Sequence, residues 1–223
     1  MIRGADENWY SSGYRDCYYS GFLGFTYNLV HKIMEQPYGT DSHFDKILEL
    51  GAGNGEHFPF VKHSYSEYFM TDIRLENLKR FENTPKVSLG KLDCTNLVEI
   101  ADNSIDRVVA TCLLVHVNTP FIALQEWRRV VKPGGVLTFY LAPEPGLLVR
   151  IVRKLFIWPK SKAKGASNPK LLAYSEHINH YPGMRTFVEE IFANDKVTFK
   201  RYPIRFLTWN FCLFEIVHVT KNH

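Results

Sequence analysis

The segment KILELGAGNG, residues 46–55, joins a short apolar run to a loop in which glycine occupies every second position. Glycines placed directly after a strand let the backbone turn sharply and approach a ligand where a Cβ would collide. A dinucleotide-binding fingerprint requires its third glycine at position 56, where this chain has Glu56. The segment therefore predicts a ligand-binding loop between a strand and a helix, with a spacing that differs from the dinucleotide fingerprint.

Further apolar runs follow this loop and are separated by turn residues and amphipathic stretches. They are EYFMTD (67–72), KVSLGKLD (86–93), DRVVATCLLV (106–115) and GGVLTFYLA (134–142). A helical pattern occupies residues 121–131, between the last two runs. Strands that alternate with helices are typical of a parallel sheet, because each parallel crossover needs a dozen or more residues.

Two more apolar runs stand near the end of the chain. They are VTFKRYPI (197–204) and NFCLFEIVHVT (210–220), and the segment between them is too short for a helix. A pair of strands joined in this way must be antiparallel. We therefore expect a hairpin at one edge of the sheet.

Residues on both sides of the glycine loop complete a recognisable pattern. Glu49 stands two residues before Gly51, and Asp72 stands 21 residues after it, at the end of the next apolar run. Asp93 ends the third run, and VKPGG (131–135) is the turn that leads into the fifth. From about residue 46 to the C-terminus, the chain resembles the class I S-adenosylmethionine (SAM)-dependent methyltransferases. The resemblance implies an α/β, Rossmann-like seven-stranded sheet, mostly parallel with an antiparallel last strand, with helices on both faces and an N-terminal helical cap.

The resemblance also implies SAM as cofactor and S-adenosylhomocysteine as product. Carried over position by position, it predicts the cofactor-binding residues Glu49, Gly51, Ala52 and Gly53 at the methionine and ribose end, Asp72 and Ile73 at the ribose and adenine edge, Asp93 and Cys94 beside the adenine, and Thr111 beside the sulfonium. A methyl group on a sulfonium is already activated, so the enzyme must align a nucleophile and exclude water. This chemistry requires no metal.

His116 and Tyr18 are the predicted catalytic residues. His116 follows the fourth apolar run, at the sheet edge that faces the methyl donor, and an imidazole is suited to proton transfer near neutral pH. An alternative role for His116 is to hydrogen-bond the next helix. Tyr18 belongs to a helical stretch, residues 11–36, whose aromatic side chains are expected either to close over the cofactor and acceptor or to face the core.

The predicted substrate-binding residues are Tyr14, Tyr19, His177 and His180. The two histidines form an H-x-x-H pair, but no further ligands stand at a spacing that would complete a zinc site. They are therefore expected either to contact the acceptor or to serve as ordinary surface or packing residues.

We interpret residues 1–223 as a single domain with an N-terminal helical cap (1–40) and an insertion or lid (143–182). The net charge is +4, and seven basic residues and no acidic residue lie in the segment 150–170. An apolar and basic stretch, 147–164, favours either peripheral contact with a membrane, guidance of a phosphorylated acceptor or a solvated amphipathic helix. A Lys/Gly/Ser/Pro-rich linker is expected at 159–169.

The small excess of positive charge argues against a nucleic-acid partner. Four scattered cysteines give neither a metal spacing nor a disulfide framework, and no long apolar segment is present, so we expect a cytoplasmic protein. The predicted function is methyl transfer from SAM, by direct in-line displacement, to oxygen or nitrogen of a small-molecule, sugar, phosphorylated or lipid-linked acceptor. The sequence does not determine the oligomeric state.

Two alternatives stay open from the sequence. One is a tRNA or rRNA methyltransferase, although TCLL (111–114) stands where many nucleic-acid and protein N-methyltransferases carry an Asn/Asp-Pro-Pro-aromatic motif. The other is a non-catalytic partner subunit with the same fold. The intact glycine loop argues against that second alternative, because glycines weaken a loop that has no ligand to bind.

Overall fold

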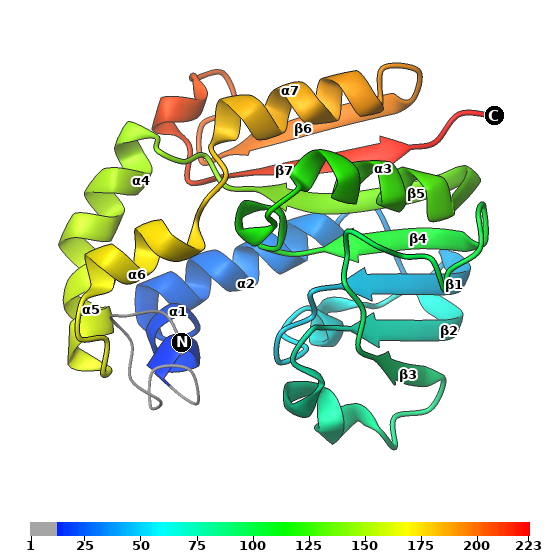
Figure 1. Ribbon diagram of the computed structural model, residues 1–223, viewed down its shortest axis with the longest axis horizontal. Coiled ribbons are helices and arrows are strands. Elements are labelled where there is room, and N and C mark those ends of the chain that lie inside the picture. The colour runs from blue at the N-terminus through cyan, green and yellow to red at the C-terminus, as the bar shows by residue number, and fades with distance from the viewer. Residues whose placement is uncertain (1–12) are drawn as a thin grey trace.

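The computed structural model describes residues 13–223 and contains a seven-stranded sheet (Figure 1). The strand order is β3-β2-β1-β4-β5-β7-β6, and β7 is antiparallel to both of its neighbours while the other pairs are parallel. The strands are β1 (His43–Leu50), β2 (Ser64–Thr71), β3 (Val87–Gly90), β4 (Ile105–Ala110), β5 (Val131–Leu141), β6 (Lys196–Tyr202) and β7 (Phe214–Thr220). This topology confirms the predicted fold class and the C-terminal hairpin.

Helices cover both faces of the sheet and gather at one end of it (Figure 1). The α-helices are α1 (Tyr14–Tyr18), α2 (Gly21–Glu35), α3 (Pro120–Val130), α4 (Leu147–Val152), α5 (Trp158–Ala163), α6 (Pro169–Glu176) and α7 (Tyr181–Ile191). The short segments are the 3-10 turns η2 (Phe58–Phe60), η3 (Leu75–Phe81), η4 (Leu114–His116) and η6 (Trp209–Phe211), and the π-helical turn η5 (Arg153–Ile157).

The core consists of two apolar layers, because successive residues of a strand point to opposite faces. Leu48 and Val108 belong to the layer that packs under α3 and α7. Their sequence neighbours Ile47 and Val109 belong to the layer that packs under α2. Burial on both faces explains why apolar residues stand side by side in these strands, as in Ile47–Leu48 and Val108–Ala110, rather than alternating with polar ones.

The helix expected after the glycine loop is absent, and this prediction was wrong. The register pairs His43 with Ser64 and Leu50 with Thr71, so the crossover must return along the strand by roughly 23 Å. Residues 51–63 would span only about 20 Å even if all of them were helical, and the glycine loop uses several of them. The segment instead consists of turns and bends, with a single 3-10 turn at Phe58–Phe60 that contains Pro59.

Other boundaries also differ from the expectations. β4 ends at Ala110 rather than Val115, because Cys112 adopts a positive φ of 54° and residues 114–116 form a 3-10 turn. β3 ends at Gly90, three residues before Asp93. The VKPGG segment lies within β5, where Gly134 has a φ of 78° and the register with β4 shifts.

The predicted cap and the predicted insertion lie against each other beyond the carboxyl ends of the parallel strands (Figure 1). Sγ of Cys17 lies 3.3 Å from Oγ of Ser161, and Nζ of Lys160 donates to the carbonyl of Ser20 at 2.7 Å. Part of the expected linker is helical, as α5. We call α4, η5, α5 and α6 together the helical wall.

Candidate active site

The glycine loop requires glycine at two positions for steric reasons. Gly51 and Gly55 have φ values of 61° and 72°, a backbone conformation that L side chains rarely adopt. A Cβ at Gly51 would lie 2.6 Å from the side chain of Leu113, and one at Gly55 would lie 2.3 Å from the ring of Phe81. The loop therefore leaves room near its backbone only because these residues lack side chains.

Asp72 lies directly after β2 and faces the glycine loop. Its Oδ2 accepts a hydrogen bond from the backbone N–H of Gly53 at 2.9 Å, and its Oδ1 accepts one from Arg74 N–H at 2.7 Å. Each carboxylate oxygen has a second lone pair that a ribose hydroxyl can use. The next residue, Ile73, is 63% exposed and offers an apolar surface beside this carboxylate.

Asp93, Cys94 and Thr111 lie at the same edge of the sheet. Asp93 is exposed, and its Oδ1 accepts hydrogen bonds from the backbone and the hydroxyl of Thr95. Burial, together with the nearby Asp93, raises the pKa of the Cys94 thiol to about 12, so that thiol is neutral. Oγ1 of Thr111 lies 3.5 Å from Sδ of Met34 on α2.

These residues suit an adenosyl group. Ligands of open α/β sheets bind outside the carboxyl ends of the strands, where the strand order changes direction. The glycine loop, Asp72, Asp93 and Thr111 follow β1, β2, β3 and β4 at that edge. Acceptors for the sugar, an exposed apolar side chain for the base and a backbone without Cβ atoms are all present. Individual roles for these residues stay predictions.

Glu49 differs from the other predicted cofactor residues because it is buried, as is Ala52. Its Oε2 accepts a hydrogen bond from the hydroxyl of Tyr68 at 2.6 Å. Burial raises the pKa of this carboxyl group. In the described conformation, Glu49 supports the loop from within the sheet.

A buried polar network holds the segment after the loop to α2. Nε2 of His57 lies 2.7 Å from Glu35 Oε1, and its Nδ1 lies 3.1 Å from Nδ1 of His31. Arg107 on β4 donates to both oxygens of Glu35, and His63 also lies beside this carboxylate. Sequence reasoning missed this network, because nothing in the spacing of its members indicates that they meet.

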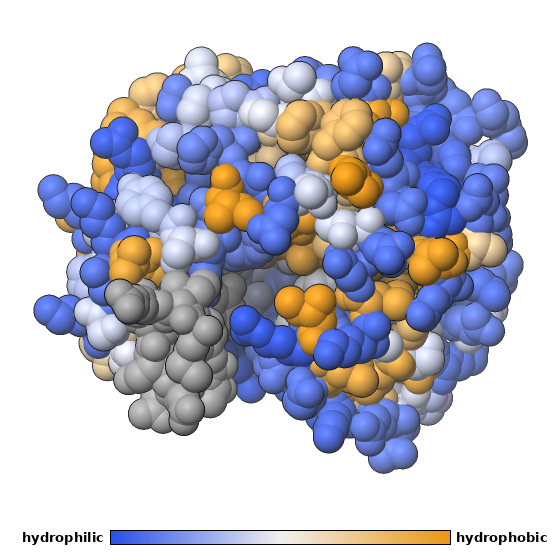
Figure 2. All heavy atoms as spheres, viewed as in Figure 1, coloured by the Kyte–Doolittle hydropathy of each residue, from blue (hydrophilic) through white to orange (hydrophobic). Residues whose placement is uncertain are grey.

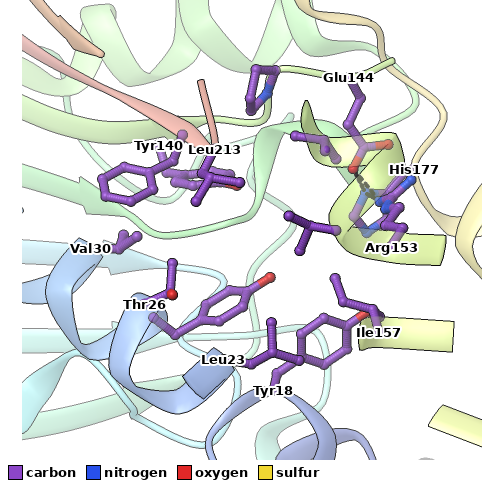
Figure 3. Close-up of a pocket in the computed structure, with 15 residues that line it drawn as sticks. Tyr18, Leu23, Thr26, Val30, Tyr140, Glu144, Arg153, Ile157, His177 and Leu213 are labelled. Atoms are coloured by element: carbon purple, nitrogen blue, oxygen red, sulfur yellow. Dashed lines mark hydrogen bonds and ion pairs between the residues drawn. The ribbon is translucent and has the colours of Figure 1, made fainter. Parts of the chain in front are cut away.

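A cavity of about 70 Å³ opens beside the strand ends, between α2 and the helical wall (Figure 3). Ala110 of β4 pairs with Phe139 of β5, so the next residues along the two strands are Thr111 and Tyr140. Tyr140 lines the cavity, which therefore adjoins the predicted position of the sulfonium. The lining is mostly apolar and includes Leu23, Val30, Val149, Val152, Ile157 and Leu213.

A polar cluster stands at one side of this cavity (Figure 3). Oε1 of Glu144 lies 2.5 Å from Nδ1 of His177 and accepts a hydrogen bond from Arg153. Burial acts to raise the pKa of Glu144, but His177 and Arg153 outweigh burial and hold that pKa below its usual value. Tyr18 also lines the cavity, and burial raises its pKa. The structure thus brings together two predicted residues, Tyr18 and His177, with two that sequence reasoning missed.

His116 lies behind this cluster. Its ring meets that of His177 edge to face at 4.7 Å, and its Nδ1 lies 2.9 Å from the carbonyl oxygen of Glu176. Although the residue is exposed overall, desolvation of its ring and the neighbouring His177 lower its pKa to about 4. His116 does not line the cavity. Its hydrogen-bond partner, residue 176, is the last residue of α6 rather than part of the next helix, α3, so the role of His116 stays a prediction.

The remaining predicted acceptor residues are spread apart. His180 is exposed and directly precedes α7. The hydroxyl of Tyr19 lies 3.5 Å from Nε2 of His31, so Tyr19 continues the buried network rather than lining the cavity. The side chain of Tyr14 lies outside the described part of the chain.

The described residues contain no cluster of three or more His, Cys, Asp or Glu side chains arranged to hold a metal ion. Within residues 13–223, no helix has the length and apolar character needed to cross a membrane.

Comparison with known proteins agrees with this geometry. Residues 48–139 match the family model described as a methyltransferase domain. The fold is similar to that of a putative methyltransferase from Haloferax volcanii, solved in complex with the Trm112 methyltransferase activator, with a TM-score of 0.63, 14% identity and full coverage of both chains. Residues 48–139 thus match a methyltransferase domain, and the chain shares its fold with a solved methyltransferase, in agreement with the class I SAM-dependent methyltransferase resemblance found in the sequence.

Two sequence relatives carry more specific names. Human thiol S-methyltransferase TMT1B is 36% identical over 104 residues, which cover 42% of this chain and 41% of that protein. Demethylmenaquinone methyltransferase of Paenarthrobacter aurescens is 32% identical over 145 residues, 61% of this chain and 56% of that protein. The chain thus matches about two fifths of the length of the thiol methyltransferase and just over half of the second relative.

Proposed function

We propose that this protein transfers a methyl group from SAM to a small, largely apolar acceptor that enters the cavity between α2 and the helical wall. The observation that carries the proposal is the position of that cavity. Tyr140 lines the cavity and is the neighbour of Thr111 across the ends of β5 and β4. The residues suited to an adenosyl group lie at the same strand ends. A methyl donor in the crevice and an acceptor in the cavity would then be neighbours.

The lining of the cavity favours the apolar members of the acceptor classes predicted from the sequence. Its cation, Arg153, already pairs with Glu144, so it is not available to a phosphate without loss of that ion pair. The names of the two relatives point the same way, since a thiol methyltransferase and a demethylmenaquinone methyltransferase act on small molecules. We therefore propose an acceptor with a hydroxyl, thiol or amine on an apolar body, which includes a lipid-linked one.

His177 is the proposed general base. When bound, SAM supplies an electrophilic methyl group. Nδ1 of His177 lies near both Glu144 Oε1 and, at 2.6 Å, a guanidinium nitrogen of Arg153, which can only donate. We propose the tautomer in which Nδ1–H donates to Glu144, because it leaves Nε2 as the proton acceptor. Glu144 fixes the ring and stabilises the imidazolium that forms, while Arg153 holds Glu144 in place. Tyr18 lines the same cavity, and its hydroxyl is proposed to orient the acceptor.

Calorimetric titration with SAM and S-adenosylhomocysteine, followed by a methylation assay, tests this function. The acceptor panel contains substituted thiophenols, phenols, hydroquinones and aromatic amines, with bulk tRNA and rRNA as a separate arm. We expect SAM binding, and methylated product with at least one small acceptor but not with RNA. The Asp72→Ala variant is the control for cofactor-dependent turnover.

Two results would contradict the proposal. Methyl transfer to RNA alone would favour the nucleic-acid alternative. SAM binding without transfer to any acceptor class, or no SAM binding at all, would favour the non-catalytic partner subunit.

A further inference from the structure

An apolar strip follows the outer side of the helical wall. Leu147, Ile151 and Leu155 stand four residues apart, and they are 43%, 44% and 60% exposed. Residues at this spacing share one side of a helix. The opposite side of the same helical stretch, at Val149 and Ile157, lines the cavity. One helical segment thus separates the cavity from an apolar surface.

The loop between β6 and β7 extends this strip. Its segment η6 packs against α4, and a Cβ on Gly146 would lie 3.2 Å from the carbonyl oxygen of Trp209. Phe206 is 88% exposed and Phe211 is 46% exposed. We call Leu147, Ile151, Leu155, Phe206 and Phe211 the outer apolar face. Exposed apolar residues gathered on neighbouring segments indicate an interaction site.

Cations lie among these apolar residues. Arg150, Lys154 and Lys162 are exposed, and the segment 150–170 contains no acidic residue. Two other cations of that segment have partners within the protein, Arg153 with Glu144 and Lys164 with Asp16. Figure 2 shows this mixture at the left edge of the molecule, where apolar and hydrophilic residues alternate over the region that Figure 1 labels α4.

The composition of this surface favours a lipid partner over a protein partner. Lysine is depleted in protein–protein interfaces, whereas aliphatic and aromatic side chains mixed with Lys and Arg are typical of helices that lie on anionic membranes. Each Lys or Arg near an anionic bilayer contributes about 1 kcal/mol, which is roughly a fivefold gain in affinity.

We propose that the outer apolar face, with Arg150, Lys154 and Lys162, docks this protein on the surface of an anionic bilayer. The apolar side chains enter the boundary between headgroups and acyl chains, and the cations contact lipid phosphates and carboxylates. Docking does not depend on the proposed methyl transfer. If both hold, an acceptor dissolved in the bilayer reaches the cavity across a single helical segment.

Co-sedimentation with vesicles tests the docking. The full chain is mixed with vesicles of phosphatidylcholine alone or of phosphatidylcholine with phosphatidylserine, at low and high salt. We expect binding to the anionic vesicles that weakens as salt rises. The charge-reversal variant Arg150→Glu/Lys154→Glu should lower the affinity by about 25-fold or more. The variant Ile151→Ser/Leu155→Ser/Phe206→Ser should lower it by about 10-fold or more.

Matched controls separate docking from general effects of charge and hydropathy. Lys62 and Lys196 are exposed near the amino ends of β2 and β6, at the end of the sheet away from the helical wall. Lys62→Glu/Lys196→Glu therefore makes the same change in net charge and should retain binding. Val98→Ser alters an apolar residue that is 76% exposed elsewhere and should also retain it. Circular dichroism and SAM titration confirm that each variant is folded.

The proposal is overturned if the parent protein binds neither kind of vesicle, or if folded face variants bind as tightly as the parent. A second copy of the chain is the other occupant considered for this face, and light scattering tests for it. Self-association that the face variants abolish, without vesicle binding, would assign the face to a second copy of the chain.

Discussion

The crevice at the glycine loop and the cavity at the helical wall use different physical means to make a site. In the crevice, backbone conformation and strand ends place the binding groups within one continuous half of the sheet. In the cavity, side chains from α1, α2, β5, β7 and the segment 143–182 converge from distant parts of the chain. The residues of the crevice therefore have a characteristic spacing in the sequence, whereas those of the cavity do not.

A substitution in the glycine loop should have the largest effect, on the crevice alone. Gly51→Val places a branched side chain at a positive φ and against Leu113. We expect SAM affinity to fall by about 100-fold or more, because left-handed strain adds to overpacking. Calorimetric titration measures this loss.

Gly134→Val is the matched control for that experiment. Gly134 has a similar φ of 78°, but a Cβ there would meet nothing within 4 Å. The Gly134→Val variant therefore has the same left-handed backbone strain but no steric contact with a neighbour. It should bind SAM as the parent protein does. Equal losses in the two variants would show that general destabilisation, rather than the shape of the loop, explains the result.

His177→Ala should have the opposite pattern, with cofactor binding retained and turnover lowered. A general base contributes about 10²- to 10⁴-fold, so we expect kcat to fall within that range. Acceptors of low pKa should be less affected, because they ionise without help. His116→Ala should lower turnover less than His177→Ala does, since His116 lies behind the cluster.

The sequence-based expectation was that His116→Ala spares cofactor binding and lowers turnover. A larger effect at His116 than at His177 would restore that assignment and remove the proposed role of His177. Glu144→Gln distinguishes orientation from packing, because the amide keeps the size of the side chain but not its charge. The pH profile of kcat should shift in this variant if Glu144 acts through His177.

Glu35 connects the two regions, since it joins α2 to His57 after the loop and to Arg107 on β4. Glu35→Ala leaves the buried guanidinium of Arg107 without its carboxylate. We expect the free energy of unfolding to fall by about 3–5 kcal/mol, measured by urea denaturation. Glu67→Ala removes an exposed ion pair with Lys46 and should cost about 1 kcal/mol or less. Similar losses in both variants would refute a structural role for the network.

A smaller effect concerns pH. Burial of its ring and the neighbouring His57 lower the pKa of His31 to about 3, from an ordinary value of 6.5. Between these values the unfolded chain binds a proton that the folded chain does not, so the stability that neutral His31 gives is lost as pH falls from about 6.5 toward 3.

His31→Gln should reduce the dependence of the unfolding free energy on pH in this window, by up to about 1.4 kcal/mol per pH unit. Urea denaturation at several pH values measures the slope. His180→Gln, at an exposed position, is the matched control. An unchanged slope in His31→Gln would mean that His31 is not held neutral in the folded protein.

Prediction from sequence succeeded where local spacing records the structure. Alternating strand and helix patterns, the glycine loop and the distance from Gly51 to Asp72 were sufficient for the sheet and for the class of protein. Prediction failed where the route of the chain between two strands determines the local structure. The helix after the loop is absent because the register of β1 and β2 leaves too few residues for it.

Local chemistry, then, was determined by the sequence: which residues turn, which strands are buried and which carboxylates follow them. Only the tertiary structure decided which distant side chains meet. Glu144, Arg153 and His177 form one cluster because α4, η5 and the end of α6 pack around a cavity. The physical reason is that buried polar groups require hydrogen-bond partners nearby in space, whereas nothing constrains how far apart those partners are in the sequence.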